Sequence, residues 1–228
     1  AGIEISHGAR PWVRRTLIRD GLGTGLFIHE GARPHIEDNR IGGNALAGIE
    51  IATGAQPEVR LNHIELCRGG GIFVHDGGGG LIEANVISGS GRAGILVRNV
   101  DSAPRLLSNT VRDGQESGVV FLDGATGLVR THRISGHRLH SVKINGAFPG
   151  LERNEIRDNQ GHGIRIVGGG GSVLSGNLLS GNAAGDLDLA GADPARLQTD
   201  FEGAPAPPSE APPSAESDST VTATPPDP

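Results

Sequence analysis

The sequence has no methionine and no tyrosine, and it has only one tryptophan and one cysteine among 228 residues. The single cysteine, Cys67, excludes an intrachain disulfide and any zinc cage built from several cysteine ligands. No apolar run is long enough to span a bilayer and no signal peptide is visible, so we expect no membrane segment. This cysteine usage leaves the compartment open and inclines us toward an intracellular protein.

Basic residues are missing from residues 197–228, which contain six acidic residues. These acids account for the whole net charge of −6, so residues 1–196 balance 20 basic against 20 acidic side chains. A neutral body lacks the basic stripe that non-specific nucleic-acid binding requires, so we expect no nucleic-acid partner. Eight of the 14 prolines also lie between Pro205 and Pro228, and this composition predicts a disordered Pro-rich acidic tail or linker over 197–228.

Glycine, by contrast, is abundant, with 38 residues, and it marks an internal repeat. A small residue followed by a short apolar alternation recurs at intervals of 22 to 24 residues, most often 23. The repeat is already running at the first residue and no initiating methionine is present, so we expect a fragment that lacks N-terminal turns. The repeats start at Gly2, Gly25, Gly48, Gly71, Gly94, Gly118, Ser141 and Gly163, with a weaker ninth start at Gly185.

Each repeat opens with an apolar alternation, such as Ile49 and Ile51 or Ile72 and Val74, which predicts a half-buried strand. Two further apolar columns follow in each repeat, and between them lies a column that is mostly asparagine. Asparagines on successive turns can hydrogen-bond to one another and to the turn backbone, which satisfies buried polar groups. The predicted asparagine ladder consists of Asn39, Asn62, Asn85, Asn109, Asn154 and Asn177, with Thr16 and His132 at the same position of their repeats.

These columns predict an all-β fold: a single-stranded right-handed parallel β-helix of about eight turns of ~23 residues over 1–196. Each turn advances by one strand spacing, roughly 4.8 Å, so the turns stack into a rod. The apolar columns would supply one continuous core along the rod axis. No helical period explains an asparagine column between two isoleucine columns, which makes it the most specific fold signal in the chain.

A double period runs inside the single one. Residues 1–5 and 47–51 both read Ala-Gly-Ile-Glu-Ile, whereas 25–31 and 71–77 read Gly-(Leu/Ile)-Phe-(Ile/Val)-His-(Glu/Asp)-Gly. This alternation resembles the substrate-receptor β-helix of F-box only proteins, and Asn159-Gln-Gly-His-Gly-Ile-Arg-Ile resembles a terminal turn of the same proteins. It also resembles the carbohydrate-binding and sugar-hydrolase β-helix superfamily. The resemblance covers about residues 1–190 and implies a substrate-binding role in a ubiquitin ligase, whose F-box is absent here.

Binding on a β-helix is expected on an outward strand face, where repeated columns make a flat surface. The two outward columns of the first strand contain several apolar side chains that would be unusual on a solvated face, and exposed apolar patches mark interaction surfaces. The alternative is that single exposed apolar side chains have no function. The candidate binding residues are Phe27, His29, Glu50, Phe73, His75, Leu96 and Arg98.

The repeated His29-Glu30 and His75-Asp76 pairs raise the question of a metal or acid–base site. The two histidines are two turns apart, about 9.6 Å at the backbone, and zinc needs ligand nitrogens within about 2.1 Å. No third ligand is apparent, so we expect no metal and no cofactor, and repeat duplication explains the pairs better. The spacing of Glu30 and Asp76 does not exclude the paired carboxylates of a glycosidase.

Two functional hypotheses follow from the sequence. The first is a non-catalytic scaffold that binds a protein or peptide partner, similar to the F-box receptors. The second is a carbohydrate-active β-helix protein: a polysaccharide lyase, an epimerase or a sugar binder. An Asp-Pro-His epimerase motif is absent and aromatic residues make up only 3% of the chain. Lys143 and Arg165 are also too many turns from Glu50 to form one catalytic set, so the scaffold hypothesis is preferred at this stage.

Overall fold

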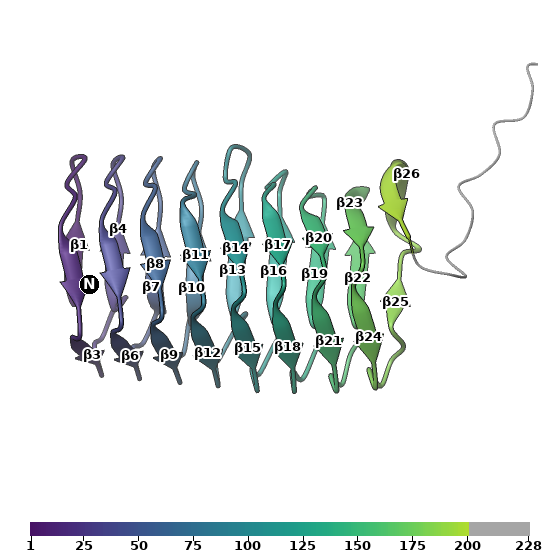
Figure 1. Ribbon diagram of the computed structural model, residues 1–228, viewed down its shortest axis with the longest axis horizontal. Helices are drawn as coiled ribbons and strands as arrows, with labels where there is room; N and C mark the ends of the chain where they lie inside the picture. The colour runs from purple at the N-terminus through teal and green to yellow at the C-terminus, as the bar shows by residue number, and fades with distance from the viewer. Residues whose placement is uncertain (201–228) are drawn as a thin grey trace, which may run out of the picture.

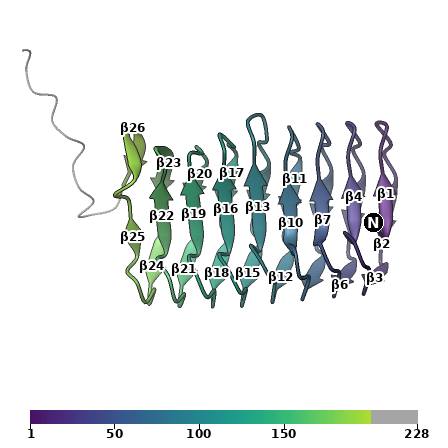
Figure 2. The ribbon, with the colours of Figure 1, turned by 180° about the vertical axis from the view of Figure 1, so that it is seen from behind.

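The computed structural model describes residues 1–200, and these residues form a rod of stacked coils. Figures 1 and 2 show β1 at one end of the rod and β25 and β26 at the other. The strands are parallel and fall into three sheets of nine, nine and eight strands, so the right-handed β-helix has about nine turns, the last of which follows the weaker repeat start at Gly185. Residues 201–228, most of the predicted tail, lie outside the described residues.

Sheet A contains the first strand of every coil, and each strand pairs with the equivalent strand of the next coil. Its strands are β1 (Ile3–Ile5), β4 (Leu26–Ile28), β7 (Ala47–Ile51), β10 (Gly70–Val74), β13 (Ile95–Arg98), β16 (Val119–Leu122), β19 (Val142–Asn145), β22 (Ile164–Val167) and β25 (Leu187–Asp188). The outward side chains of this sheet carry the candidate site described below.

In each coil, a strand of sheet B follows the strand of sheet A after a turn. The last strand of sheet B is the longest strand in the described chain. That strand runs to residue 199, so regular structure continues three residues past the expected domain boundary at 196. The strands are β2 (Trp12–Arg14), β5 (His35–Glu37), β8 (Glu58–Arg60), β11 (Leu81–Glu83), β14 (Arg105–Leu107), β17 (Leu128–Arg130), β20 (Gly150–Glu152), β23 (Gly170–Ser175) and β26 (Ala192–Thr199).

Sheet C closes each coil before the chain returns to sheet A. Its strands are β3 (Leu17–Arg19), β6 (Arg40–Gly42), β9 (His63–Glu65), β12 (Val86–Ser88), β15 (Thr110–Arg112), β18 (Arg133–Ser135), β21 (Glu155–Arg157) and β24 (Leu178–Ser180). Among residues 1–200 there is no helix long and apolar enough to cross a membrane.

The strand register places equivalent residues of successive repeats directly above one another. Ile72 pairs with Ile49 on one side and with Ile95 on the other, and all three are essentially inaccessible to solvent. The predicted inward columns of all three sheets join one core cluster that runs along the rod. The alternation in the sequence therefore predicted correctly which face of each strand is buried.

The predicted asparagine ladder is confirmed between sheets B and C. The Asn62 amide donates to the Ile36 carbonyl (2.8 Å) and to Asn85 Oδ1 (3.0 Å), and its backbone N–H donates to the same Oδ1 (2.9 Å). His132 continues the column, because its backbone N–H donates to Asn154 Oδ1 at 2.9 Å. Each rung thus satisfies the backbone of one coil and the side chain of the next.

A second internal ladder lies in the turn between sheets C and A, and the sequence analysis did not predict it. This turn contains buried Asn44, Cys67 and Ser90 in three successive coils, Gly114 in the next coil, and then His137, Asn159 and Asn182. His137 accepts the backbone N–H of Gly114 at Nδ1 (3.2 Å), and Asn159 donates to Asn182 Oδ1 (2.8 Å). Cys67 lies 3.9 Å from Asn44 Nδ2 within this ladder, and burial raises the pKa of its thiol.

The glycine column at the repeat starts is explained by close packing. A Cβ on Gly94 would overlap Val111 Cγ1 and would lie 2.7 Å from the Gly118 carbonyl oxygen. The chain entering sheet A therefore approaches both the side chains of sheet C and the next coil too closely for a side chain. The exception is Ser141, whose buried hydroxyl has no hydrogen-bond partner in the described residues.

Candidate functional site

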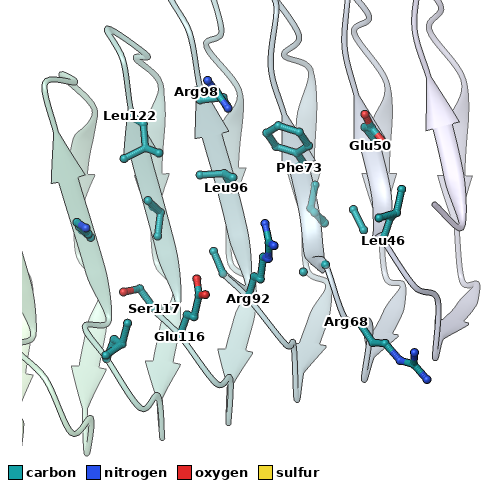
Figure 3. A pocket seen from close by; sticks show the side chains of 18 of the residues that line it. Leu46, Glu50, Arg68, Phe73, Arg92, Leu96, Arg98, Glu116, Ser117 and Leu122 are labelled. Carbon is teal, nitrogen blue, oxygen red and sulfur yellow. The ribbon is translucent and has the colours of Figure 1, made fainter. Parts of the chain in front are cut away.

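A groove runs over the outward face of sheet A and encloses about 830 Å³. It crosses the coils from β7 to β19 and includes the turns that lead into these strands, as Figure 3 shows. In-register parallel strands aim equivalent side chains in the same direction on every coil. The groove is therefore parallel to the rod axis, and its residues are spaced by one coil each.

The floor of the groove is apolar. Phe73 on β10, Leu96 on β13 and Val120 on β16 are neighbours in register, and Leu122 lies beside them. Val120 is only 8% exposed, and Phe73 and Leu96 are half-buried. These side chains make a continuous apolar strip across three coils.

Charged side chains line the rim of this strip. The cations are Arg68, Arg92, Arg98 and Lys143, and the carboxylates are Glu50 and Glu116. Figure 3 shows Arg92 extending toward the strands near Leu96 and Glu116, whereas Arg68 points away from them.

Ion pairing inside the groove leaves an excess of positive charge. Arg98 lies 3.5 Å from Asp123, and Glu50 Oε1 lies 3.1 Å from His75 Nε2. Arg68, Arg92 and Lys143 have no ion-pair partner among residues 1–200. These three cations are therefore available to an anionic ligand.

At the β7 end of the groove, His75 bridges two carboxylates. Its Nε2 lies 3.1 Å from Glu50 Oε1, and its Nδ1 lies 2.8 Å from Asp76 Oδ2. The hydrogen bond with His75 lowers the pKa of Glu50, and the same bond raises the pKa of His75. Thr24 completes the arrangement by donating to the other Glu50 oxygen at 2.8 Å.

The same unit recurs two coils earlier. His29 Nε2 lies 3.0 Å from Glu4 Oε1, and its ring stacks on Phe27 with a centroid distance of 4.2 Å. His75 stacks on Phe73 at the same distance. No group of three or more His, Cys, Asp or Glu side chains in the described residues is arranged to hold a metal ion. The repeated histidines therefore link adjacent coils and cover the aromatic rings.

At the other end of the groove the side chains are basic. Lys143 on β19 is the register neighbour of Arg165 on β22. Arg165 Nη1 lies 3.5 Å from His140 Nε2, and the His140 ring lies 5.5 Å from the His162 ring. Burial first, and then the neighbouring cations, lower the pKa of His140.

The groove gathers only some of the residues predicted from the sequence. Glu50, Phe73, Leu96 and Arg98 line it, and His75 contacts it through Glu50. Phe27 on β4 and His29, just after this strand, lie outside the groove and form the separate stacked pair. The sequence did not predict Arg68, Arg92, Glu116 and His140, which lie in the turns before the strands. Aligning these turns across the repeats, as was done for the strands, would have revealed them.

A family model described as a right handed beta helix region matches residues 1–102 and 68–196 of the chain. The search of curated proteins gives no match. Among solved structures, the chain is similar to the periplasmic alginate epimerase AlgG, with a TM-score of 0.62, 14% identity and coverage of 86% of this chain and 61% of that chain. A double mutant of AlgG gives a TM-score of 0.67 at 14% identity, covering 87% and 55%.

The A-module of the mannuronan C-5 epimerase AlgE4 of Azotobacter vinelandii is also similar, with a TM-score of 0.51, 16% identity and coverage of 81% and 63%. At these identities the likeness shows the fold alone. The chain spans less than two thirds of the length of each of these structures. They are epimerases rather than F-box proteins, so the F-box resemblance remains unconfirmed.

Proposed function

Because the chain belongs to the right-handed β-helix family, we propose that its sheet A groove binds an acidic polysaccharide. The observation that carries this proposal is the run of cations without ion-pair partners along an apolar strip. Epimerases of alginate and mannuronan are among the similar solved structures, and they support a polysaccharide ligand over a protein partner.

The shape of the groove favours a polymer over a small ion. Arg92 and Lys143 belong to different coils, and successive coils are separated by about 4.8 Å. A chain of sugars lying along the rod would present its anionic groups to these side chains in turn. The apolar faces of the sugar rings would lie on Phe73, Leu96 and Val120, since ligand grooves combine an apolar lining with a few polar contacts.

A protein-interaction surface is the second candidate function. It is favoured by the apolar strip and by Leu46 and Leu139, which line the groove and are 54% and 47% exposed. A partner on this surface would be anchored by Phe73 and Leu96, because apolar and aromatic anchors dominate such interfaces. The two candidates differ in the contribution of charge, which can be measured directly.

Reversing two groove charges should abolish most of the binding of an acidic glycan. We expect an Arg92→Glu, Lys143→Glu variant to bind alginate or galacturonate oligomers roughly 100-fold more weakly, since each lost contact becomes a repulsion. Isothermal titration calorimetry would measure the affinity, with neutral cello-oligosaccharides of matched length as the comparison ligand. Higher salt concentration should also weaken the binding of the acidic glycan to the native chain, because salt screens the charges.

The matched control is Arg40→Glu with Arg105→Glu, which makes the same charge change on exposed positions of sheets C and B. This control should bind like the native chain. Equal affinity of the groove variant, or a native preference for the neutral oligomers, would refute an acidic ligand. A partner that is lost with Phe73→Ser but retained with both charge reversals would favour the protein-interaction surface instead.

A further inference from the structure

Four basic side chains meet at the C-terminal end of the groove: His140, Lys143, His162 and Arg165. Lys143 and Arg165 are direct neighbours on adjacent parallel strands. Like charges at neighbouring positions of a sheet destabilise it. The fold therefore maintains an unfavourable arrangement here, and a bound anion would relieve it.

His140 is held in one tautomer by the backbone. Its Nδ1 accepts the backbone N–H of His162 at 3.0 Å, so Nδ1 carries no proton and the neutral ring is protonated at Nε2. Burial and the nearby cations lower the pKa of His140, so the ring is neutral near pH 7. Nε2 then faces Arg165 Nη1 at 3.5 Å, and both of these atoms are donors.

Among residues 1–200, Asp188 is the carboxylate that pairs with this cluster. Asp188 Oδ2 forms an ion pair with Arg165, at 3.0 Å from Nε. The angle at Nε is too poor for a hydrogen bond, so this buried nitrogen has no hydrogen-bond partner in the described residues. Asp188 also acts on His140 in the direction that raises its pKa, but less than burial and the cations act against it. Glu116 lines the same groove and forms no ion pair within residues 1–200. The Nε2–H of His140 and the Lys143 ammonium have no acceptor in the described chain.

We propose that His140, Lys143 and Arg165 form a subsite that holds one anionic group, a carboxylate or a sulfate, of a bound sugar. The inference rests on the proposed function, since it names the position at which an acidic glycan is held most tightly. His140 would donate a neutral hydrogen bond, and Lys143 and Arg165 would donate charge-assisted ones, which are shorter and stronger. Three such donors, two of them charged, would select an anion over a hydroxyl group.

The subsite couples anion binding to the protonation of His140. An anion beside Nε2 stabilises the charged ring, so it should raise the pKa of His140 toward its ordinary value. By linkage, the anion should bind more tightly as the pH falls through that range. His75, which is already paired with Glu50 and Asp76 at the other end of the groove, should not respond.

Nitrogen-15 NMR of the histidine rings in the full chain would test the subsite. The probes are sodium glucuronate, glucose 6-sulfate and glucose at millimolar concentration, because single sugars are expected to bind weakly. We expect the free protein to show the Nε2–H tautomer at His140. Glucuronate, glucose 6-sulfate or both should shift the ring nitrogen resonances of His140 and raise its pKa, whereas glucose should do neither. The sugar with the larger effect identifies the anionic group that the subsite prefers.

Two variants sharpen the test. Lys143→Gln should weaken the response to the anionic sugar by about tenfold, whereas Arg92→Gln should leave it unchanged while weakening the binding of a polymer. A protonated or Nδ1–H ring at pH 7, or an equal response to glucose, would overturn the subsite. If polymers bind but no anionic sugar perturbs His140, the subsite is wrong and the proposed function stands. If anionic sugars act at His140 but no polymer binds, the proposed function fails alone.

Discussion

Replacing Asn85 with leucine should lower the free energy of unfolding by about 2 kcal/mol or more. The Asn85 amide donates to the Val59 carbonyl (2.9 Å) and to Asn109 Oδ1 (3.0 Å), and its Oδ1 accepts both the backbone N–H and the amide of Asn62 (2.9 and 3.0 Å). Leucine keeps similar bulk but removes the side-chain partner of the Val59 carbonyl and of the Asn62 backbone N–H, whereas Asn109 Oδ1 and the Asn62 amide keep other hydrogen bonds. Each such group costs roughly 1–3 kcal/mol.

Urea denaturation of the native chain and the variant would measure this loss. The matched control is Asn145→Leu, the same substitution on the exposed end of β19, which should change the stability by less than about 0.5 kcal/mol. An Asn85→Leu variant that unfolds at the native urea concentration would show that the ladder contributes nothing to stability. A change in the slope of the transition would show that the rod no longer unfolds as one unit.

Acid should destabilise the rod through His132, the histidine in the asparagine ladder. Complete burial lowers the pKa of this side chain from 6.5 to about 4. The folded state therefore favours the neutral ring, while the unfolded chain binds a proton below about pH 6.5. Stability from this residue is fully present above pH 6.5 and is lost progressively as the pH falls toward 4, by about 3 kcal/mol.

The variant His132→Asn should remove this dependence, because asparagine fills the same position in most other coils. Native and variant stabilities measured by urea denaturation at about pH 7 and pH 4.5 would isolate the effect, since all other titrating groups are common to both. The variant should lose less stability than the native chain on acidification. Equal losses would mean that His132 is protonated in the fold without penalty.

The sequence predicted the parts of the structure that repeat at a constant spacing. The asparagine and isoleucine columns follow from that spacing, because a parallel coil places equivalent residues directly in register. The second ladder was not predicted, because asparagine, cysteine, serine and histidine alternate within it and no single residue type marks the column. What these residues share is a buried polar atom at the same turn, and that is apparent only once the coil is closed.

The candidate site was predicted in part for a related reason. Phe27 and Phe73 lie on the outward face, as the alternation predicts, but no contact for their rings was predicted from the sequence. In the structure each ring stacks on the histidine two residues later, at 4.2 Å. Side chains two apart on a strand point to the same face, so this contact could have been expected. The turn residues that line the groove were not predicted, because their positions depend on how the chain bends as it enters sheet A.

The repeat varies in length from coil to coil without disturbing the stacking of the coils. The interval from Gly94 to Gly118 is one residue longer than its neighbours, yet Asn85 and Asn109 still hydrogen-bond in register. Asn99 and Asp101, both in the left-handed region, lie in the turn before β14, and the columns return to phase beyond it. A turn can thus take up an extra residue without shifting the strands or the ladder of the neighbouring coils. The length of the groove, in contrast, depends on the number of coils that it crosses, and it changes in steps of about 4.8 Å, one coil at a time.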